Sequence, residues 1–289
     1  MLPELPKTPP PQSPQGLLPQ DLQPQRLQPE APLPEAWAQV RWVLTDVDDT
    51  LTLHGRLPPE SLIALAQLRH AGLKVVAVTG ACAGWCDHIA QAWPLDAVIG
   101  ENGAFIMHRA EGRLQIDTAQ PMAQMRAAQA ALRARIEVIL KDHPDLDFTL
   151  DQAYRLCEVA IDIGQHRPRI EAERIETLLT AVRATGAQAT ASSIHINAWQ
   201  GEHSKRSTAL AWLARHGISG EAAQSLACCI GDSPNDQGLF EVLPLSAGVA
   251  NIRTHWDRLI HKPSVVMTQE GGLGFAQFAQ KLLARVGSA

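Results

Sequence analysis

Four aspartates stand in two groups, and each group follows an apolar run typical of a buried strand. Asp46 and Asp48 form the first group, and Asp232 and Asp236 form the second. The carboxyl ends of neighbouring parallel strands meet at one sheet edge, where these carboxylates repel one another unless a cation lies among them. All-oxygen ligation favours Mg²⁺, which keeps several waters and shares a substrate phosphate. The spacing therefore predicts a Mg²⁺ site at this edge.

The same positions suit the transfer of a phosphoryl group. Asp46 beside Mg²⁺ is a nucleophile toward phosphate that forms an aspartyl-phosphate, and Asp48 can protonate the leaving alkoxide and later deprotonate water. The phosphoryl oxygens need further partners. Thr79 and the backbone after it, at Gly80, end the next core strand, and Lys205 opens a helix that can bring a positive charge.

Each piece also has a simpler explanation. The run from Asp46 to Thr50 fits an Asx-turn, the loop from Gly231 to Asp236 fits a helix cap, and Lys205 fits a solvated surface charge. Only the combination favours chemistry, because all pieces have suitable residue types and follow suitable elements in one order.

These segments resemble the four motifs of the haloacid dehalogenase (HAD) superfamily of phosphatases. Asp46-Val47-Asp48-Asp49-Thr50-Leu51 resembles the first motif, Val78-Thr79-Gly80 the second, Lys205 the third and Gly231-Asp232-Ser233-Pro234-Asn235-Asp236 the fourth. The resemblance covers about residues 40 to 285. An insertion between the second and third motifs resembles the type-II capped group.

Two further segments resemble the Cof-like subgroup, which includes phosphatases of sucrose phosphate, trehalose phosphate and mannosylphosphoglycerate. They are Glu101-Asn102-Gly103-Ala104 and Gly248-Val249-Ala250-Asn251. Two positions depart from the pattern, with Asp49 where glycine is frequent and Ala81 where arginine usually follows Thr-Gly. The missing arginine removes a cation near the phosphate.

The resemblance implies a role for each motif residue. Asp46 is the expected nucleophile and a metal ligand, and Asp48 is the acid and base, with its backbone carbonyl also on Mg²⁺. Thr79, Gly80 and Lys205 are expected to hold the phosphate. The remaining expected site residues are Asp232 as a metal ligand, Asp236 at the metal, and Asn102 and Asn235 at the phosphate or substrate.

The elements that must position these residues follow an α/β rhythm. Apolar runs alternate with helical segments over residues 40–99 and again over 205–286, which predicts a doubly wound parallel sheet. Between them, a hairpin, two amphipathic helices and alternating strands predict an inserted α+β cap domain. We expect a core at 37–107 and 200–289, and a cap at 108–199.

Residues 1–36 differ in composition, because eleven of the twenty prolines lie there. Proline fixes φ and removes a backbone donor, so we expect a disordered tail. In the cap, the segment from Ser193 to Trp199 predicts a strand with His195, Asn197 and Trp199 on one face. Some of these residues, or of Arg155, His166, Arg167 and Arg169, are expected to contact a polyol or a second anionic group. The alternative is that His195 and Trp199 only pack or cap.

Composition excludes several classes of partner. The net charge is −5 and no basic stripe is present, so we expect neither nucleic acid nor membrane as a partner. The five cysteines match no zinc pattern, and no signal peptide is evident, so we expect a cytoplasmic protein.

The sequence thus predicts a Mg²⁺-dependent phosphomonoester hydrolase for a small phosphorylated metabolite, a sugar or glycerate phosphate. Two alternatives stay open. One is a phosphomutase of the same superfamily. The other is a non-catalytic sugar-phosphate sensor, which Ala81 and the proline-rich tail would favour.

Overall fold

The computed structural model describes residues 31–118, 120–192 and 194–287, and the chain from Leu33 onward forms one compact unit. The tail expected over residues 1–36 lies outside the described part up to residue 30. Its last residues are ordered, since Leu33 is buried in the core and a 3₁₀-helix spans Glu35–Gln39. The folded part of the chain therefore begins before residue 37, because the buried side chains of Leu33 and Trp37 hold this segment on the core.

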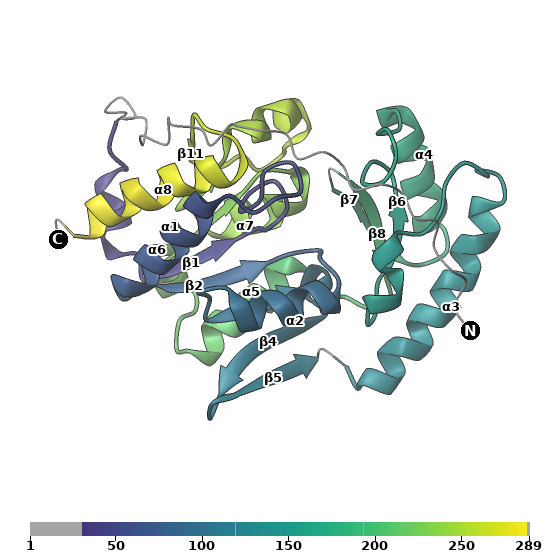
Figure 1. The fold of residues 1–289 in the computed structure, drawn as a ribbon, viewed down its shortest axis with the longest axis horizontal. Coiled ribbons are helices and arrows are strands. Elements are labelled where there is room, and N and C mark those ends of the chain that lie inside the picture. The colour runs from purple at the N-terminus through teal and green to yellow at the C-terminus, as the bar shows by residue number, and fades with distance from the viewer. Residues whose placement is uncertain (1–30, 119, 193, 288–289) are drawn as a thin grey trace, which may run out of the picture. The chain divides into compact units, whose positions relative to one another are not determined.

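A large sheet of eight strands has the order β11-β10-β9-β1-β2-β3-β4-β5 (Figure 1). The strands from β11 to β3 pair in parallel, and β4 and β5 are added antiparallel at one edge. Their bounds are β1 Trp42–Thr45, β2 Lys74–Val78, β3 Ala97–Gly100, β4 Phe105–Ala110, β5 Arg113–Thr118, β9 Ala227–Gly231, β10 Ser246–Gly248 and β11 Val265–Val266.

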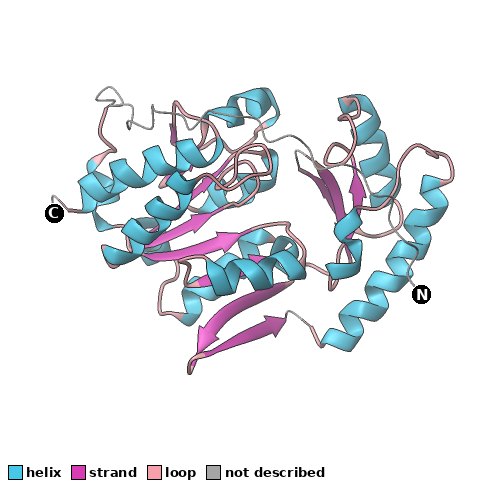
Figure 2. Ribbon diagram, in the orientation of Figure 1, coloured by secondary structure: helices cyan, strands magenta, loops and turns pink. Residues whose placement is uncertain are grey.

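Helices cover both faces of this sheet, as Figure 2 shows. One apolar cluster joins it to α1, α2 and α8, and a second joins its other face to α5, α6 and α7. This burial on both faces explains why the central strands are continuous apolar runs. The bounds are α1 Pro59–His70, α2 Ala83–Ala92, α5 Lys205–Arg215, α6 Glu221–Leu226, α7 Gln237–Val242 and α8 Gly271–Val286.

A separate small sheet has the antiparallel order β6-β8-β7 and packs against α3 and α4 through a third apolar cluster. The predicted α/β fold, with a parallel-rich sheet and a second α+β part, is confirmed. Strand β7 was not predicted, because Gln188-Ala189-Thr190-Ala191 carries little apolar signal. The bounds are β6 Val159–Asp162, β7 Gln188–Ala191, β8 His195–Trp199, α3 Met122–Leu140 and α4 Ala172–Arg183.

The hairpin of β4 and β5 extends the large sheet, although residue 108 was the expected start of the cap. Its first strand explains this, because Phe105 and Met107 pack on one face of the sheet and Ile106 on the other. A strand with apolar side chains on both faces is stable where both faces are buried, and its place in the large sheet buries both. The domain boundaries otherwise stay a prediction.

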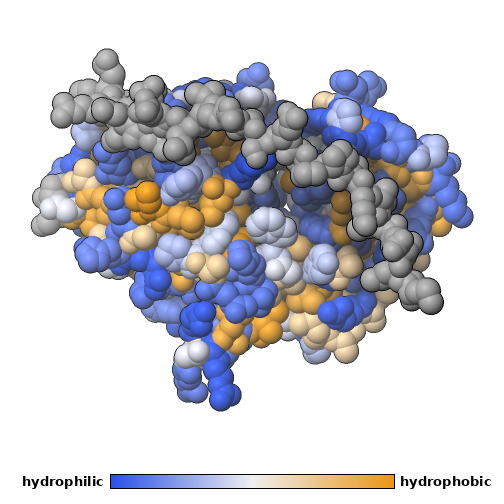
Figure 3. Space-filling model, in the orientation of Figure 1, coloured by the Kyte–Doolittle hydropathy of each residue, from blue (hydrophilic) through white to orange (hydrophobic). Residues whose placement is uncertain are grey.

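The surface mixes polar and apolar side chains, and Figure 3 shows apolar ones over α1 and α8 on the face in view. Leu62 and Ile63 on α1 and Leu273 on α8 are among the exposed large apolar residues. Within the described ranges, no helix combines the length and apolar content that crossing a bilayer requires.

We predict that Gly103→Ala destabilises the protein more than Gly112→Ala. Both glycines have positive φ, which costs about 1–2 kcal/mol for alanine. A Cβ at residue 103 would also lie 2.3 Å from the backbone oxygen of Ser204, whereas a Cβ at residue 112 would meet nothing within 4 Å. Relieving that clash should cost a further ~1–3 kcal/mol. Urea unfolding of both variants measures the difference, and equal losses would show that this contact imposes no constraint.

Candidate active site

The ammonium of Lys205 lies between two carboxylates. Its Nζ donates to Oδ1 of Asp46 at 2.5 Å and to Oδ1 of Asp236 at 2.8 Å. Lys205 is the first residue of α5, and Ser204 caps that helix by accepting from the backbone N–H of Ser207, which fixes where the lysine emerges. Burial opposes the charge, but Asp236 and Asp46 raise the pKa of Lys205 above its ordinary value. The lysine is therefore a buried, permanently charged bridge.

Three buried carboxylates meet at this bridge. Asp46, Asp232 and Asp236 each offer an oxygen within 4.8 Å of the others. Burial raises the pKa of Asp46 to about 8 although Lys205 lowers it, and burial with the charge of Asp46 raises the pKa of Asp232 well above its ordinary value. One ammonium does not balance this group, and oxygen ligands of this kind suit a hard divalent cation. The donor set therefore fits Mg²⁺.

Backbone and amide donors aim the two carboxylates of the loop after β9. Oδ2 of Asp236 accepts from the backbone N–H groups of Asp232 and Ser233 at 3.1 and 3.3 Å. Nδ2 of Asn251 donates to Oδ2 of Asp232 at 3.2 Å and to the backbone oxygen of Asp49 at 3.0 Å. The sequence analysis singled out the segment that contains Asn251, but it did not predict the contact of Asn251 with Asp232.

Asp48 lies outside the group of three carboxylates and lines the adjacent cavity. Burial raises the pKa of its carboxyl to about 6, and the charge of Asp49 adds to this, while Lys205 and Arg155 oppose it. A carboxyl with such a pKa can give and take a proton near neutral pH. The expected contact of its backbone carbonyl with a metal stays a prediction.

The segment after β2 brings backbone groups to the same place. Thr79 is fully buried, and its Oγ1 accepts from the backbone N–H of Ala81 at 3.0 Å. Gly80 lines the cavity, and a Cβ there would lie 2.7 Å from Nδ2 of Asn197 and 3.1 Å from Nδ2 of Asn102. Only glycine leaves room for these two amides at this point.

The predicted amide ligands divide into two kinds. Asn235 and Asn197 line the cavity, whereas Asn102 is buried behind it. Asn102 accepts from Asn235 at 3.1 Å and donates to Oε1 of Glu158 at 2.7 Å, so it positions other residues. Asn197 is different, because its Oδ1 is buried without a hydrogen-bond partner in the described residues. A buried acceptor of this kind can take a hydrogen bond from a ligand hydroxyl.

The remaining cap residues lie at different depths. His195 lines the cavity, its Nε2 lies 2.7 Å from Oε1 of Gln165, and burial lowers its pKa to about 4, so it is neutral near pH 7. Arg169 also lines the cavity. Arg167 instead pairs with Asp145 at the surface, and the indole of Trp199 donates to the backbone oxygen of His203. His166 lies in a neighbouring cavity.

One cavity of about 430 Å³ lies beside these groups, although Lys205, Thr79 and Asp236 are not among the residues that line it. It lies between the strand ends of the large sheet and the small sheet with its loops. The side chains most relevant to chemistry along its wall are Asp46, Asp48, Arg155, Arg169, His195, Asn197, Asp232 and Asn235.

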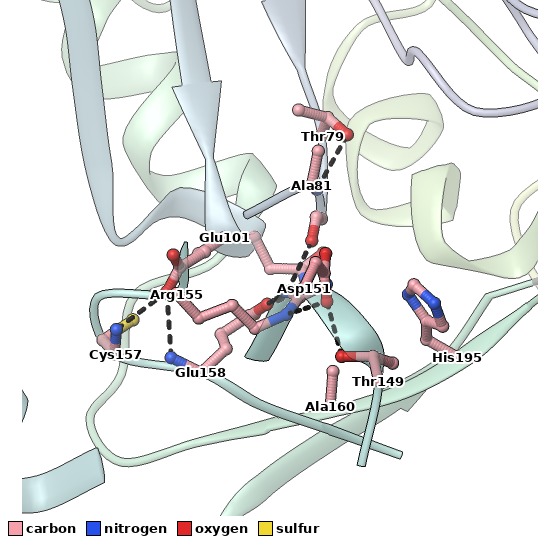
Figure 4. Close-up of polar contacts among 12 residues, drawn as sticks. Thr79, Ala81, Glu101, Thr149, Asp151, Arg155, Cys157, Glu158, Ala160 and His195 are labelled. Carbon is pink, nitrogen blue, oxygen red and sulfur yellow. Dashed lines mark hydrogen bonds and ion pairs between the residues drawn. The ribbon is translucent and has the colours of Figure 1, made fainter. Parts of the chain in front are cut away.

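A buried ion network that begins at the cavity wall joins the two sheets, and it was not predicted from the sequence (Figure 4). Arg155 is 2% exposed, and its guanidinium donates to Asp151, to Glu158 and to the backbone oxygen of Gly80. Burial opposes the charge of Arg155, but Glu158 and Asp151 raise its pKa further. The guanidinium thus carries its own counter-charges, and Arg155 is one of the cap residues of which some were expected to contact a ligand.

Glu101 completes the junction from the core side. Its Oε1 accepts from the backbone N–H groups of Ala83 and Leu156, and its Oε2 accepts from those of Cys157 and Glu158, all within 2.7–3.1 Å. One fully buried carboxylate thereby fixes three consecutive backbone groups of the chain that leads into β6.

The spacing of Asp151, Arg155 and Glu158 could have indicated the ion network in the sequence, because residues three and four apart can pair.

Residues 43–151 match the family of haloacid dehalogenase-like hydrolases. This part of the chain is similar to that family. No curated protein sequence matches the chain. The family match confirms the predicted resemblance to the superfamily.

Solved structures share the fold of the chain. The Thermoplasma acidophilum protein 0175 is 16% identical, with a TM-score of 0.67, over 84% of this chain and 98% of that one. A putative HAD/COF-like hydrolase from Plasmodium vivax is 14% identical, with a TM-score of 0.64, over 86% and 98%. The sucrose-phosphatase from Synechocystis, in complex with sucrose and phosphate, is 16% identical, with a TM-score of 0.60, over 84% and 98%.

We predict that Glu101→Gln lowers the free energy of unfolding by about 2–4 kcal/mol, because an NH₂ group would then face two buried backbone donors. Glu202→Gln is the matched control, since Glu202 is exposed, and it should change stability by at most ~0.5 kcal/mol. Chemical denaturation of both variants tests this. A Glu101→Gln protein as stable as the control would mean that Glu101 does not hold the small sheet to the large one.

Proposed function

We propose that the protein cleaves small phosphomonoesters in two steps, with Asp46 as the nucleophile and Mg²⁺ as cofactor. The observation that carries this is the bridge of Lys205 to Asp46 and Asp236, beside a third buried carboxylate, at the floor of a cavity. Mg²⁺ would be held by Asp46, Asp232 and Asp236, and would supply charge stabilisation for the phosphoryl oxygens. The fold neighbours include phosphatases, which supports the same reaction class.

The residues divide the work. A carboxylate oxygen of Asp46 bonds to phosphorus as the bond from phosphorus to the ester oxygen breaks, and Asp48 gives its proton to the leaving oxygen. Water then attacks the aspartyl-phosphate, Asp48 takes its proton, and phosphate leaves. Lys205 holds Asp46 in place and neutralises charge that develops on the phosphoryl group. Thr79 and Gly80 would hold phosphoryl oxygens.

The cavity supports a hydroxyl-bearing leaving group. Asn197, whose Oδ1 has no hydrogen-bond partner among the described residues, and His195, whose imidazole is neutral, both line the cavity. Among the fold neighbours are a sucrose-phosphatase, a sugar phosphatase and a trehalose-6-phosphate phosphatase-related protein. We therefore propose a sugar or glycerate phosphate as substrate. The described cysteines are all free, which is compatible with the proposed cytoplasmic location.

We predict that Asp46→Asn abolishes the release of phosphate from 4-nitrophenyl phosphate and from sugar phosphates, by at least about a thousandfold in kcat/KM, because an amide is a poor nucleophile. Asp49→Asn makes the same change of charge nearby, and it should stay within about tenfold of wild type. Measuring inorganic phosphate with Mg²⁺ present separates hydrolysis from transfer to another hydroxyl, which a phosphomutase would show. More than a tenth of the activity in Asp46→Asn would contradict the assignment.

We further predict that a chelator removes activity and that added Mg²⁺ restores it. Asp232→Asn should raise the Mg²⁺ concentration for half-maximal rate, because it removes a charged ligand. Asn251→Ala leaves the charged ligands in place and removes hydrogen bonds to Asp232, Asp49 and Gly271, so its effect should be smaller, about tenfold. Rates measured across Mg²⁺ concentrations give both values. Full activity in excess chelator would rule out the cofactor.

A further inference from the structure

The segment Thr79-Gly80-Ala81, which follows β2, is held through its three backbone oxygens. The first and third of them accept from the backbone N–H groups of Asn102 and Glu101, at 3.0 and 3.2 Å. The middle one, of Gly80, accepts from Nη1 of Arg155 at 3.0 Å. A substitution can therefore remove the middle contact alone, because a side chain makes it.

The peptide unit between Gly80 and Ala81 is fixed at both ends. Arg155 holds its carbonyl, and its N–H donates to Oγ1 of Thr79 at 3.0 Å, as Figure 4 shows for Ala81 and Thr79. A peptide unit is planar, so two contacts on opposite sides set its orientation. Ala81 has no polar side chain that could do the same. The orientation of this unit therefore depends on Arg155.

The backbone N–H of Gly80 gives this orientation a chemical consequence. Gly80 lines the active-site cavity, and its N–H has no hydrogen-bond acceptor among the residues that the structure describes. The N–H lies between two carbonyls that are both held, one by Asn102 and one by Arg155. Its direction is therefore set before a ligand binds, and a donor arranged in advance stabilises phosphoryl charge without reorganisation.

Arg155 also reaches the loop after β9, through two intermediates. Its Nη1 donates to Oε2 of Glu158 at 3.1 Å, and Oε1 of Glu158 accepts from Asn102 at 2.7 Å. Asn102 in turn accepts from Asn235 at the cavity wall, at 3.1 Å. The guanidinium itself is held by a forked contact with Asp151, at 3.0 and 3.3 Å. One fixed side chain thus contacts both segments expected at the phosphate.

We propose that Arg155 is a positioning residue of the phosphate site, which directs the backbone donor of Gly80 toward the phosphoryl group by holding the Gly80 carbonyl. The inference rests on the proposed phosphomonoester hydrolysis. Arg155 follows the 3₁₀-helix Leu150–Tyr154 and lies outside the large sheet, so the affinity for phosphate depends on a residue of the smaller α+β part. A buried ion pair that only joined the two sheets would affect stability alone.

The test measures the inhibition constant of inorganic phosphate against hydrolysis of 4-nitrophenyl phosphate, with Mg²⁺ in excess. This constant does not depend on how much of the enzyme is folded, so a loss of stability alone leaves it unchanged. In Arg155→Met we expect it to rise about tenfold, and kcat/KM to fall by a similar factor, because the phosphate donors lose their fixed geometry.

Arg155→Lys covers the case in which Arg155→Met does not fold. It keeps a positive charge beside Asp151 and Glu158, but an ammonium cannot replace the fork that reaches Asp151 and Gly80 together. The inhibition constant should therefore rise in this variant as well.

Two control variants separate positioning from stability. Arg126→Met removes an exposed arginine from α3 and should change neither the inhibition constant nor stability. Leu178→Ala removes a fully buried side chain from the third apolar cluster, and should lower the free energy of unfolding while leaving the inhibition constant unchanged.

The outcomes separate this inference from the proposed function. If 4-nitrophenyl phosphate is hydrolysed but the folded Arg155 variants have the wild-type inhibition constant, the positioning role is wrong and the hydrolysis stands. A rise of equal size in Leu178→Ala would also contradict the positioning role. If the wild-type protein hydrolyses no phosphomonoester, the proposed function fails. Calorimetric titration with inorganic phosphate then decides, since equal affinities in wild type and Arg155→Lys, or no binding at all, would overturn the role of Arg155.

Discussion

The buried ammonium of Lys205 joins two carboxylates that come from different strand ends, and most of the site is arranged around it. Asp46 follows β1 and Asp236 lies five residues beyond the end of β9, so the contact requires β1 and β9 to be neighbours in the sheet. Removing the lysine would leave buried carboxylates without a counter-charge, which typically costs several kcal/mol. Even with the lysine, three carboxylates exceed one ammonium, and that excess makes a divalent cation a fitting partner.

A second constraint joins the small sheet to the large one. Glu101 and Arg155 work from opposite sides of the junction, because the carboxylate accepts cap backbone donors and the guanidinium donates to the backbone of Gly80. The residues Glu101, Asn102 and Gly103 all have positive φ, a strained arrangement that the surrounding contacts must hold. Asn102 then links this junction to Asn235 at the cavity wall. The position of the leaving-group side is thereby coupled to the position of the phosphate side.

The sequence predicted most of what depends on strand ends. Asp46, Thr79 and Asp232 could be placed because apolar runs mark buried strands and parallel strands end at one edge, whereas Lys205 was placed at the start of a predicted helix. The ion network of Glu101, Arg155 and Glu158 was missed, because its members come from separate segments and meet only in the folded chain. The hairpin could not be assigned to the large sheet from the sequence, because that depends on the burial of Phe105 and Ile106 on opposite faces of the sheet. The helices α6 and α7 have only six residues each, too few for a clear periodic signal.

The stereochemistry of transfer at phosphorus tests the central claim, that Asp46 attacks the phosphoryl group, most directly. A substrate whose phosphoryl group carries sulfur and two different oxygen isotopes, hydrolysed in water labelled with the third isotope, gives inorganic thiophosphate of measurable configuration. Two successive in-line displacements, first by Asp46 and then by water, predict retention of configuration. Inversion would show a single attack by water, and would contradict a covalent role for Asp46.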